Sequence, residues 1–251
     1  MSVVTEKKVF EAPSCLTDKV FHFCPGCHHG LIHRLVGEAI DQFALAGSAI
    51  GVIGVGCGVF LYDYLTVDCC EAPHGRAPAV ATGIKRVNPD SFVFTYQGDG
   101  DLAGIGTGEI IHAAARGENI TVIFVNNSVY GMTGGQMAPT TLPGQKTTTT
   151  PEGREPARDG YPLRMAELLA SLEGTAYSAR VSCHDNLHLR RAAKALNKAF
   201  RAQVEKRGFS VVEFLSACPT NWHLTPEQSR QKIISEMVPA YPPGVFRDFD
   251  D

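Results

Sequence analysis

FVFTYQGDGD at residues 92–101 is followed 25 residues later by the pair Asn126-Asn127, and these two stretches carry most of the information on the fold. An apolar run with strand composition precedes each polar signature, at residues 92–96 and 121–125. The segment between them, residues 102–117, has the length and composition of a helix. This order predicts neighbouring parallel strands that carry both polar signatures at their carboxyl ends, where open α/β sheets bind ligands.

The residue types at these two strand ends suit a magnesium–diphosphate site. Gly98 and Gly100 have no Cβ atom, so backbone amides can approach an anion closely, and the following helix directs its positive end toward it. Asp99 offers a carboxylate oxygen, while the Asn127 amide and a backbone carbonyl shortly after it offer two more. Mg²⁺ prefers a few protein oxygens together with substrate phosphates. The alternative is an ordinary Gly/Asp turn followed by a polar loop.

Composition limits the class of protein. A chain of 251 residues suits one large α/β domain, with or without an appendage. The net charge of -3 is dispersed along the chain and does not favour nucleic acid or an anionic membrane as partner. Residues 1–20 contain no apolar signal segment and the sequence has no 18-residue apolar stretch, which predicts a soluble, cytoplasmic protein.

The pattern of elements predicts an α/β fold with a mostly parallel sheet and helices on both faces. We expect an extended arm at residues 1–23, a long loop at 131–162, and no regular structure at 240–251. We therefore predict one domain over residues 1–218 and a C-terminal segment, 219–251, that packs on it or on a partner. Besides the elements above, we expect helices at residues 28–43, 75–87, 163–172, 186–206 and 225–237, and strands at 50–55, 176–181 and 210–215.

Eight cysteines without an export signal favour metal binding, redox chemistry or buried thiols over a disulfide framework. Cys24 and Cys27 form a CxxC at a helix start, while Cys57 and Cys218 each follow a predicted strand. A redox dithiol would use the CxxC alone. A structural zinc site would need four thiolates, and zinc ribbons usually supply two CxxC pairs. An iron–sulfur cluster accepts thiolates from distant segments, and this is the interpretation we favour.

The GDG and NN signatures together resemble the motif of thiamine-diphosphate enzymes. The resemblance implies that Mg²⁺ is bound by Asp99, Asn127 and the backbone carbonyl of Val129. It further implies that a second set contacts the diphosphate or its surroundings: Gly100, Asp101, Gly131 and Met132.

A longer series of motifs resembles the β subunit of 2-oxoacid:ferredoxin oxidoreductases. In order, these are CPGC at 24–27, Gly-Cys at 56–57, HGRA at 74–77, GDGD, the NN pair, YGMTGGQ at 130–136, PTT at 139–141 and Cys-Pro at 218–219. The resemblance implies that a [4Fe–4S] cluster is bound by Cys24, Cys27, Cys57 and Cys218. It implies thiamine contacts for Val55, Gly56, Cys57, Gly58 and His74. The remaining cysteines match no ligand position and are expected to be free thiols: Cys15, Cys69, Cys70 and Cys183.

The same resemblance implies oxidative decarboxylation of a 2-oxoacid to acyl-CoA and CO₂, with electrons passed through the cluster to ferredoxin. 2-Oxoglutarate and branched-chain 2-oxoacids are the substrates we favour. We expect no catalytic residue in this chain, because the glutamate that activates thiamine belongs to a pyrimidine-binding domain, here expected on an α subunit. Further γ and δ subunits are compatible with this arrangement. Two alternatives are a non-redox thiamine-diphosphate decarboxylase subunit and a zinc-stabilised scaffold subunit without catalytic activity.

Overall fold

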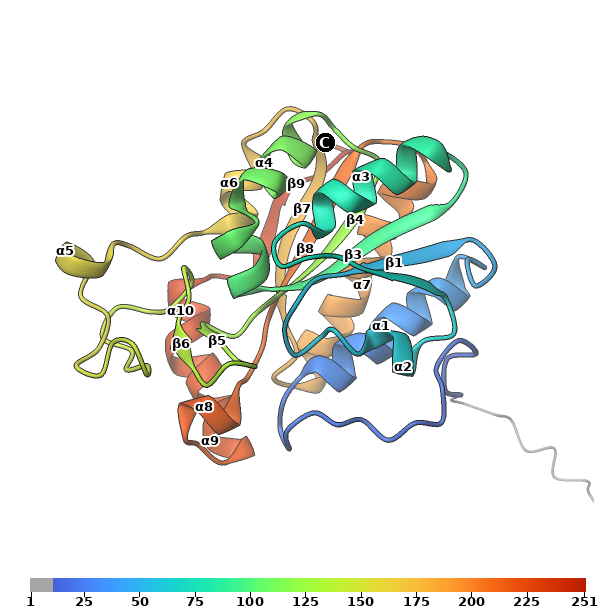
Figure 1. The fold of residues 1–251 in the computed structure, drawn as a ribbon. Helices are drawn as coiled ribbons and strands as arrows, with labels where there is room; N and C mark the ends of the chain where they lie inside the picture. Colours follow the sequence, from blue (N-terminus) through green and yellow to red (C-terminus); the bar gives the residue numbers. More distant parts are fainter. Residues whose placement is uncertain (1–10) are drawn as a thin grey trace, which may run out of the picture.

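The computed structural model describes residues 11–251 and is built around a seven-stranded sheet (Figure 1). Its strand order is β2-β1-β3-β4-β8-β7-β9, and all pairings are parallel except that of β9 with β7. A separate antiparallel hairpin consists of β5 and β6. The strands are β1 (Ala49–Ile53), β2 (Asp68–Glu71), β3 (Phe92–Gly98), β4 (Thr121–Asn126), β5 (Val129–Tyr130), β6 (Gln136–Met137), β7 (Thr175–Ser182), β8 (Phe209–Leu215) and β9 (Gly244–Arg247).

Helices cover both faces of the sheet, as Figure 1 shows: α3, α4 and α6 lie on one side, α1 and α7 on the other. Every helix and strand predicted between residues 28 and 237 is present, so the predicted fold class is confirmed. The α-helices are α1 (His29–Gln42), α2 (Leu61–Tyr64), α3 (Ala77–Val87), α4 (Thr107–Ala115), α5 (Pro156–Asp159), α6 (Met165–Ala170), α7 (Asn186–Val204), α8 (Pro219–Trp222), α9 (Pro226–Lys232) and α10 (Val238–Ala240). Two π-helical segments, Gly100–Ile105 and Ile233–Met237, precede α4 and α10.

The central strands β3 and β4 are apolar because both of their faces are buried. In β3, Phe94 and Tyr96 pack in the core beneath α1 and α7, while Val93 packs in the core beneath α3 and α4. The parallel register pairs Gly98 of β3 with Val125 of β4. The residues that follow these two strands therefore leave the sheet at the same edge.

The prediction that residues 240–251 lack regular structure is wrong. Strand β9 pairs antiparallel with β7 at the edge of the sheet, and Arg247 donates hydrogen bonds to the carbonyls of Ala170, Leu172 and Glu173. Four residues after a Pro-Pro pair carry too little strand signal to be recognised. The strand forms because it satisfies the backbone groups along the open edge of β7. The sequence analysis also did not predict the edge strand β2, because its four residues likewise carry too little strand signal.

The N-terminal arm and the long loop each have a tertiary anchor. Residues 1–10 of the predicted arm lie outside the described residues, and Leu16 forms an isolated bridge with Leu65. In the loop, the buried guanidinium of Arg154 donates hydrogen bonds to backbone carbonyls of Ala138, Thr141 and Tyr161. Arg154 thus fixes the loop over the carboxyl edge of the sheet. Within residues 11–251, no helix combines the length and apolarity needed to cross a bilayer.

Candidate functional site

All the residues predicted to contact Mg²⁺ or thiamine diphosphate line one cavity at the carboxyl edge of β1, β3 and β4. Its volume is about 80 Å³. The structure thereby brings together four segments that are far apart in the sequence: residues 55–58, 74, 99–101 and 127–132. The predicted residues in its wall are Val55, Gly56, Cys57, Gly58, His74, Asp99, Gly100, Asp101, Asn127, Val129, Gly131 and Met132.

Asp99 is a buried carboxylate that has no cationic hydrogen-bond partner within residues 11–251. One oxygen accepts from the Gly100 backbone amide at 2.9 Å, and the other accepts from the Thr140 hydroxyl. Burial raises the pKa of Asp99 to about 7, against the lowering effect of these hydrogen bonds. The charged form of a buried carboxylate with few hydrogen-bond donors is stabilised by a nearby positive charge. A divalent cation beside Asp99 fits this environment.

The two asparagines after β4 have different surroundings. Asn126 is fully buried, donates to the Glu213 carboxylate at 2.7 Å, and accepts from the Ser128 amide. Asn127 instead lines the cavity, and its side-chain oxygen accepts from the Val129 amide at 3.2 Å. Ser128, directly after them, adopts a left-handed conformation with φ of 61°. Asn126 therefore anchors the turn, whereas Asn127 is the asparagine available to a ligand.

Glycines around the cavity fall into two groups. A Cβ atom on Gly98 or Gly56 would meet no heavy atom within 4 Å, so both open onto free space. A Cβ on Gly100 or Gly58 would instead lie 2.1 Å from Tyr130 or 2.4 Å from Tyr96. Gly98 and Gly56 thus leave room for a bound group, while Gly100 and Gly58 are required for packing.

Asp101 is predicted to touch the diphosphate or its surroundings, and its carboxylate accepts hydrogen bonds from protein donors. It is buried and accepts from the backbone amides of Val55 and Gly75, the Gln97 amide and the His74 ring. These four bonds join the loops that follow β1 and β2 to the end of β3. Asp101 therefore positions the cavity wall, and a direct diphosphate contact stays a prediction.

The four predicted cluster ligands line a second cavity of about 260 Å³: Cys24, Cys27, Cys57 and Cys218. Burial raises the pKa of Cys27 to about 12, and the other three thiols add to this effect. Burial likewise raises the pKa of Cys57 and Cys218, and the nearby Asp99 carboxylate adds to the increase. Such thiolates need a positively charged centre to be stable, which fits an iron–sulfur cluster.

The spacing of the thiols is wider than a single zinc ion requires. Tetrahedral zinc with bonds of about 2.3 Å places its sulfur ligands roughly 3.8 Å apart. Within residues 11–251, no three of these four sulfurs lie within 4.8 Å of one another. All eight cysteines are free thiols, including those that match no ligand position: Cys15, Cys69, Cys70 and Cys183. The donor set is therefore better suited to a cluster than to one zinc ion.

The two cavities share a wall. His29, Cys57, Asn127, Gly131 and Met132 line both of them. The Cβ position of Gly131 is 3.4 Å from the Cys57 sulfur, 3.5 Å from the Asn127 amide nitrogen and 3.6 Å from the Cys218 sulfur. The predicted metal site and the predicted cluster site are thus separated by little more than one glycine.

Sequence reasoning missed three residues that shape this region. Thr140 holds the Asp99 carboxylate, and its own carbonyl accepts from the Tyr241 hydroxyl at 2.7 Å. Asn221, in α8, donates to the Cys218 sulfur at 3.2 Å and to the Gly131 carbonyl at 2.7 Å. The PTT motif offered a signal for Thr140. Nothing in the sequence marked Asn221 or Tyr241.

Comparisons with known proteins agree with this geometry. Residues 55–214 match the family described as thiamine pyrophosphate enzyme, C-terminal TPP binding domain. The chain is 48% identical to ketoisovalerate oxidoreductase subunit VorA of Methanothermobacter thermautotrophicus, over 96% of this chain and 50% of that protein. It is 38% identical to 2-oxoglutarate synthase subunit KorB of Methanocaldococcus jannaschii, over 81% of this chain and 72% of that protein.

A solved structure has the same fold. It is the 2-oxoglutarate:ferredoxin oxidoreductase from Magnetococcus marinus with 2-oxoglutarate, coenzyme A and succinyl-CoA bound, and it superposes with a TM-score of 0.78 at 24% identity. The match covers 96% of this chain and 86% of that one. The chain spans about half the length of the ketoisovalerate oxidoreductase subunits that it matches.

Proposed function

Because this chain belongs to the family of 2-oxoacid:ferredoxin oxidoreductase subunits that carry the thiamine pyrophosphate-binding domain, we propose that it binds thiamine diphosphate, Mg²⁺ and a [4Fe–4S] cluster in a complex that oxidises a 2-oxoacid. The complex would produce an acyl-CoA and CO₂ and pass electrons to ferredoxin. The single observation that carries this proposal is the shared wall between the two cavities. It brings a site for carbon chemistry next to a site for an electron acceptor.

Each group of residues has a distinct part in this proposal. Asp99, Asn127 and the Val129 carbonyl would hold Mg²⁺, and the open space at Gly98 would admit the diphosphate. Bound thiamine diphosphate supplies the electron sink that decarboxylation of a 2-oxoacid needs. Asp101 keeps the surrounding loops in place through its protein donors. The four thiolates at residues 24, 27, 57 and 218 would hold the cluster.

A complete thiamine enzyme needs a glutamate beside the aminopyrimidine ring. The acidic side chains in the described cavity wall are Asp99 and Asp101, both of which have other roles. We therefore propose that the glutamate comes from outside these 251 residues, either from an α subunit or from a further domain of the same polypeptide. Coenzyme A, ferredoxin and any γ and δ subunits would join the same complex.

Three smaller proposals complete this assignment. Residues 1–218 would be the cofactor-binding domain, with 219–251 packed on it, since Asn221 and Tyr241 bond to its site loops. Eight free thiols suit a reducing compartment, which favours the cytoplasm. A branched-chain 2-oxoacid is the favoured substrate, because the relative with higher identity is named for ketoisovalerate.

The purified complex tests the function directly. We expect coenzyme A-dependent reduction of ferredoxin, with kcat/KM for ketoisovalerate at least about tenfold above that for 2-oxoglutarate or pyruvate. CO₂ release without ferredoxin reduction would instead assign a non-redox decarboxylase. A complex that retains zinc but no thiamine diphosphate would assign a scaffold subunit.

Gly98→Ala separates a cofactor cradle from ordinary packing. Because its Cβ would enter open space, we expect the variant to keep the wild-type Tm without cofactor but to lose at least about tenfold in thiamine-diphosphate affinity. Gly100→Ala is the matched comparison, and its clash with Tyr130 should lower Tm even without cofactor. Unchanged affinity in Gly98→Ala, measured by titration of fluorescence quenching, would remove this glycine from the proposed site.

A further inference from the structure

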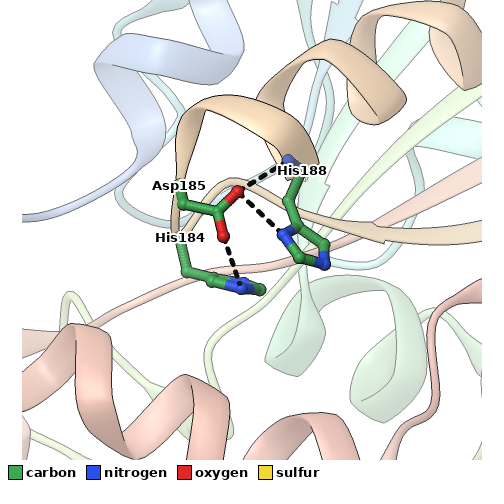
Figure 2. A group of neighbouring side chains, drawn as sticks. All are labelled: His184, Asp185 and His188. Atoms are coloured by element: carbon green, nitrogen blue, oxygen red, sulfur yellow. Dashed lines mark hydrogen bonds and ion pairs between the residues drawn. The ribbon is translucent and has the colours of Figure 1, made fainter.

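His184, Asp185 and His188 form a compact group of side chains at the junction of β7 and α7, outside both cavities (Figure 2). One potential ligand atom from each residue lies within 4.8 Å of the others. His184 Nε2 is 3.4 Å from one oxygen of Asp185, and His188 Nδ1 is 2.8 Å from the other. Four ligands at about 2.05 Å around zinc are roughly 3.3 Å apart, close to the first of these separations.

His184 is held in one orientation before any ligand arrives. Its side chain is only 6% exposed, and its Nδ1 is 2.8 Å from the Ser182 hydroxyl. That contact directs Nε2 toward Asp185, as Figure 2 shows. A hydrogen bond at the second ring nitrogen is the arrangement that fixes histidine ligands in metal sites.

The helix cap explains only part of this arrangement. Asp185 is the N-cap of α7, and its Oδ1 accepts from both the backbone amide and the ring of His188. Its Oδ2 takes no part in the cap and faces His184. A cap needs neither the buried His184 nor a second imidazole, yet the two rings lie with centroids only 4.0 Å apart. The cap thus leaves Oδ2 of Asp185 and the facing Nε2 of His184 outside its own hydrogen bonds, with a second imidazole beside them.

We propose that His184, Asp185 and His188 bind one divalent transition-metal ion, with zinc as the best-suited ion. Two imidazoles and one carboxylate are a ligand set that zinc accepts, with the fourth position open to water or to a donor group from another molecule. Asp185 and His188 are 43% and 25% exposed, so the ion has access from solvent. This site is independent of the proposed thiamine and cluster sites.

Zinc binding by the anaerobically purified complex tests the proposal. After treatment with a mild chelator and equilibration at a free zinc concentration about tenfold above the wild-type Kd, we expect Asp185→Asn and His188→Ala each to carry about one zinc per chain less than wild type. Asparagine is an equally good N-cap, so Asp185→Asn should keep the stability of α7. Ser182→Ala, which frees the His184 ring, should weaken zinc binding by about 10- to 100-fold.

His112→Ala is the control, because His112 is an exposed histidine on α4 away from the group. We expect it to bind as much zinc as wild type. The cysteines are unchanged in all of these variants, so any zinc that they bind cancels when the zinc content of a variant is compared with that of wild type. Equal zinc content and equal affinity in wild type, Asp185→Asn and His188→Ala would overturn the proposal, whatever the catalytic activity of the complex.

Discussion

Asp99→Asn is expected to abolish retention of thiamine diphosphate and to lower 2-oxoacid oxidation by more than about 100-fold. Even outer-shell groups of metal sites contribute about 10- to 100-fold to affinity or activity, and Asp99 is proposed as a direct ligand. Asparagine has nearly the same shape and keeps an acceptor for the Gly100 amide. The substitution also removes a carboxyl group whose charged form is disfavoured by burial. The cofactor-free variant should therefore have a Tm equal to or above that of wild type.

Cofactor content after desalting, together with the iron content of the same sample, measures this effect. We expect the iron content to stay at the wild-type level, because the thiolates are untouched. Asp90→Asn is the matched control, since Asp90 is exposed and lies outside both cavities. If Asp99→Asn kept its full thiamine-diphosphate content, the magnesium assignment would be wrong.

The position of Asp99 was predictable because it depends on strand order alone. Both runs before the polar signatures are continuously apolar, which identifies central strands buried on two faces. Once β3 and β4 are adjacent and parallel, the residues after them must meet at one edge. The convergence of Asp99 and Asn127 on one cavity follows from that geometry.

The residues that were missed act through contacts that leave no periodic trace. Thr140 reaches Asp99 from a loop that is ordered mainly by the carbonyl bonds of Arg154. Asn221 reaches the cavity lined by the four predicted cluster cysteines, here called the thiol cavity. It does so from the four-residue helix α8, whose position depends on the rest of the fold. Sequence patterns report local periodicity and strand order, so side chains that arrive through tertiary packing escape them.

Asp101 shows a different limit. A carboxylate beside glycines in a GDGD stretch suggests ligand binding for both aspartates. The surroundings of Asp99 fit a metal ligand. The structure distinguishes the two, because the donors to Asp101 come from the loops after β1 and β2 and from the end of β3. Only the folded chain shows that its carboxylate oxygens already accept hydrogen bonds from the protein and so join the segments of the cavity wall.

The opposite selective loss is expected for Cys218→Ser. Because a serine hydroxyl is a poor substitute for a thiolate ligand, we expect the iron content to fall from about four per chain to near zero, and 2-oxoacid-dependent ferredoxin reduction to fall by more than about 100-fold. Cys218 lines the thiol cavity but not the cavity around Asp99. Thiamine diphosphate should therefore remain bound at the wild-type level.

Cys70→Ser is the matched control, because Cys70 is a half-buried free thiol on the edge strand β2. Iron and acid-labile sulfide assays on anaerobically purified complexes decide the outcome. Retention of iron in Cys218→Ser would exclude this cysteine as a ligand, and loss of zinc in place of iron would favour the scaffold alternative. Asp99→Asn and Cys218→Ser should each remove one cofactor and spare the other, because the two sites meet at Gly131 but share no proposed metal ligand. Loss of both cofactors in either variant would mean that the sites are not independent.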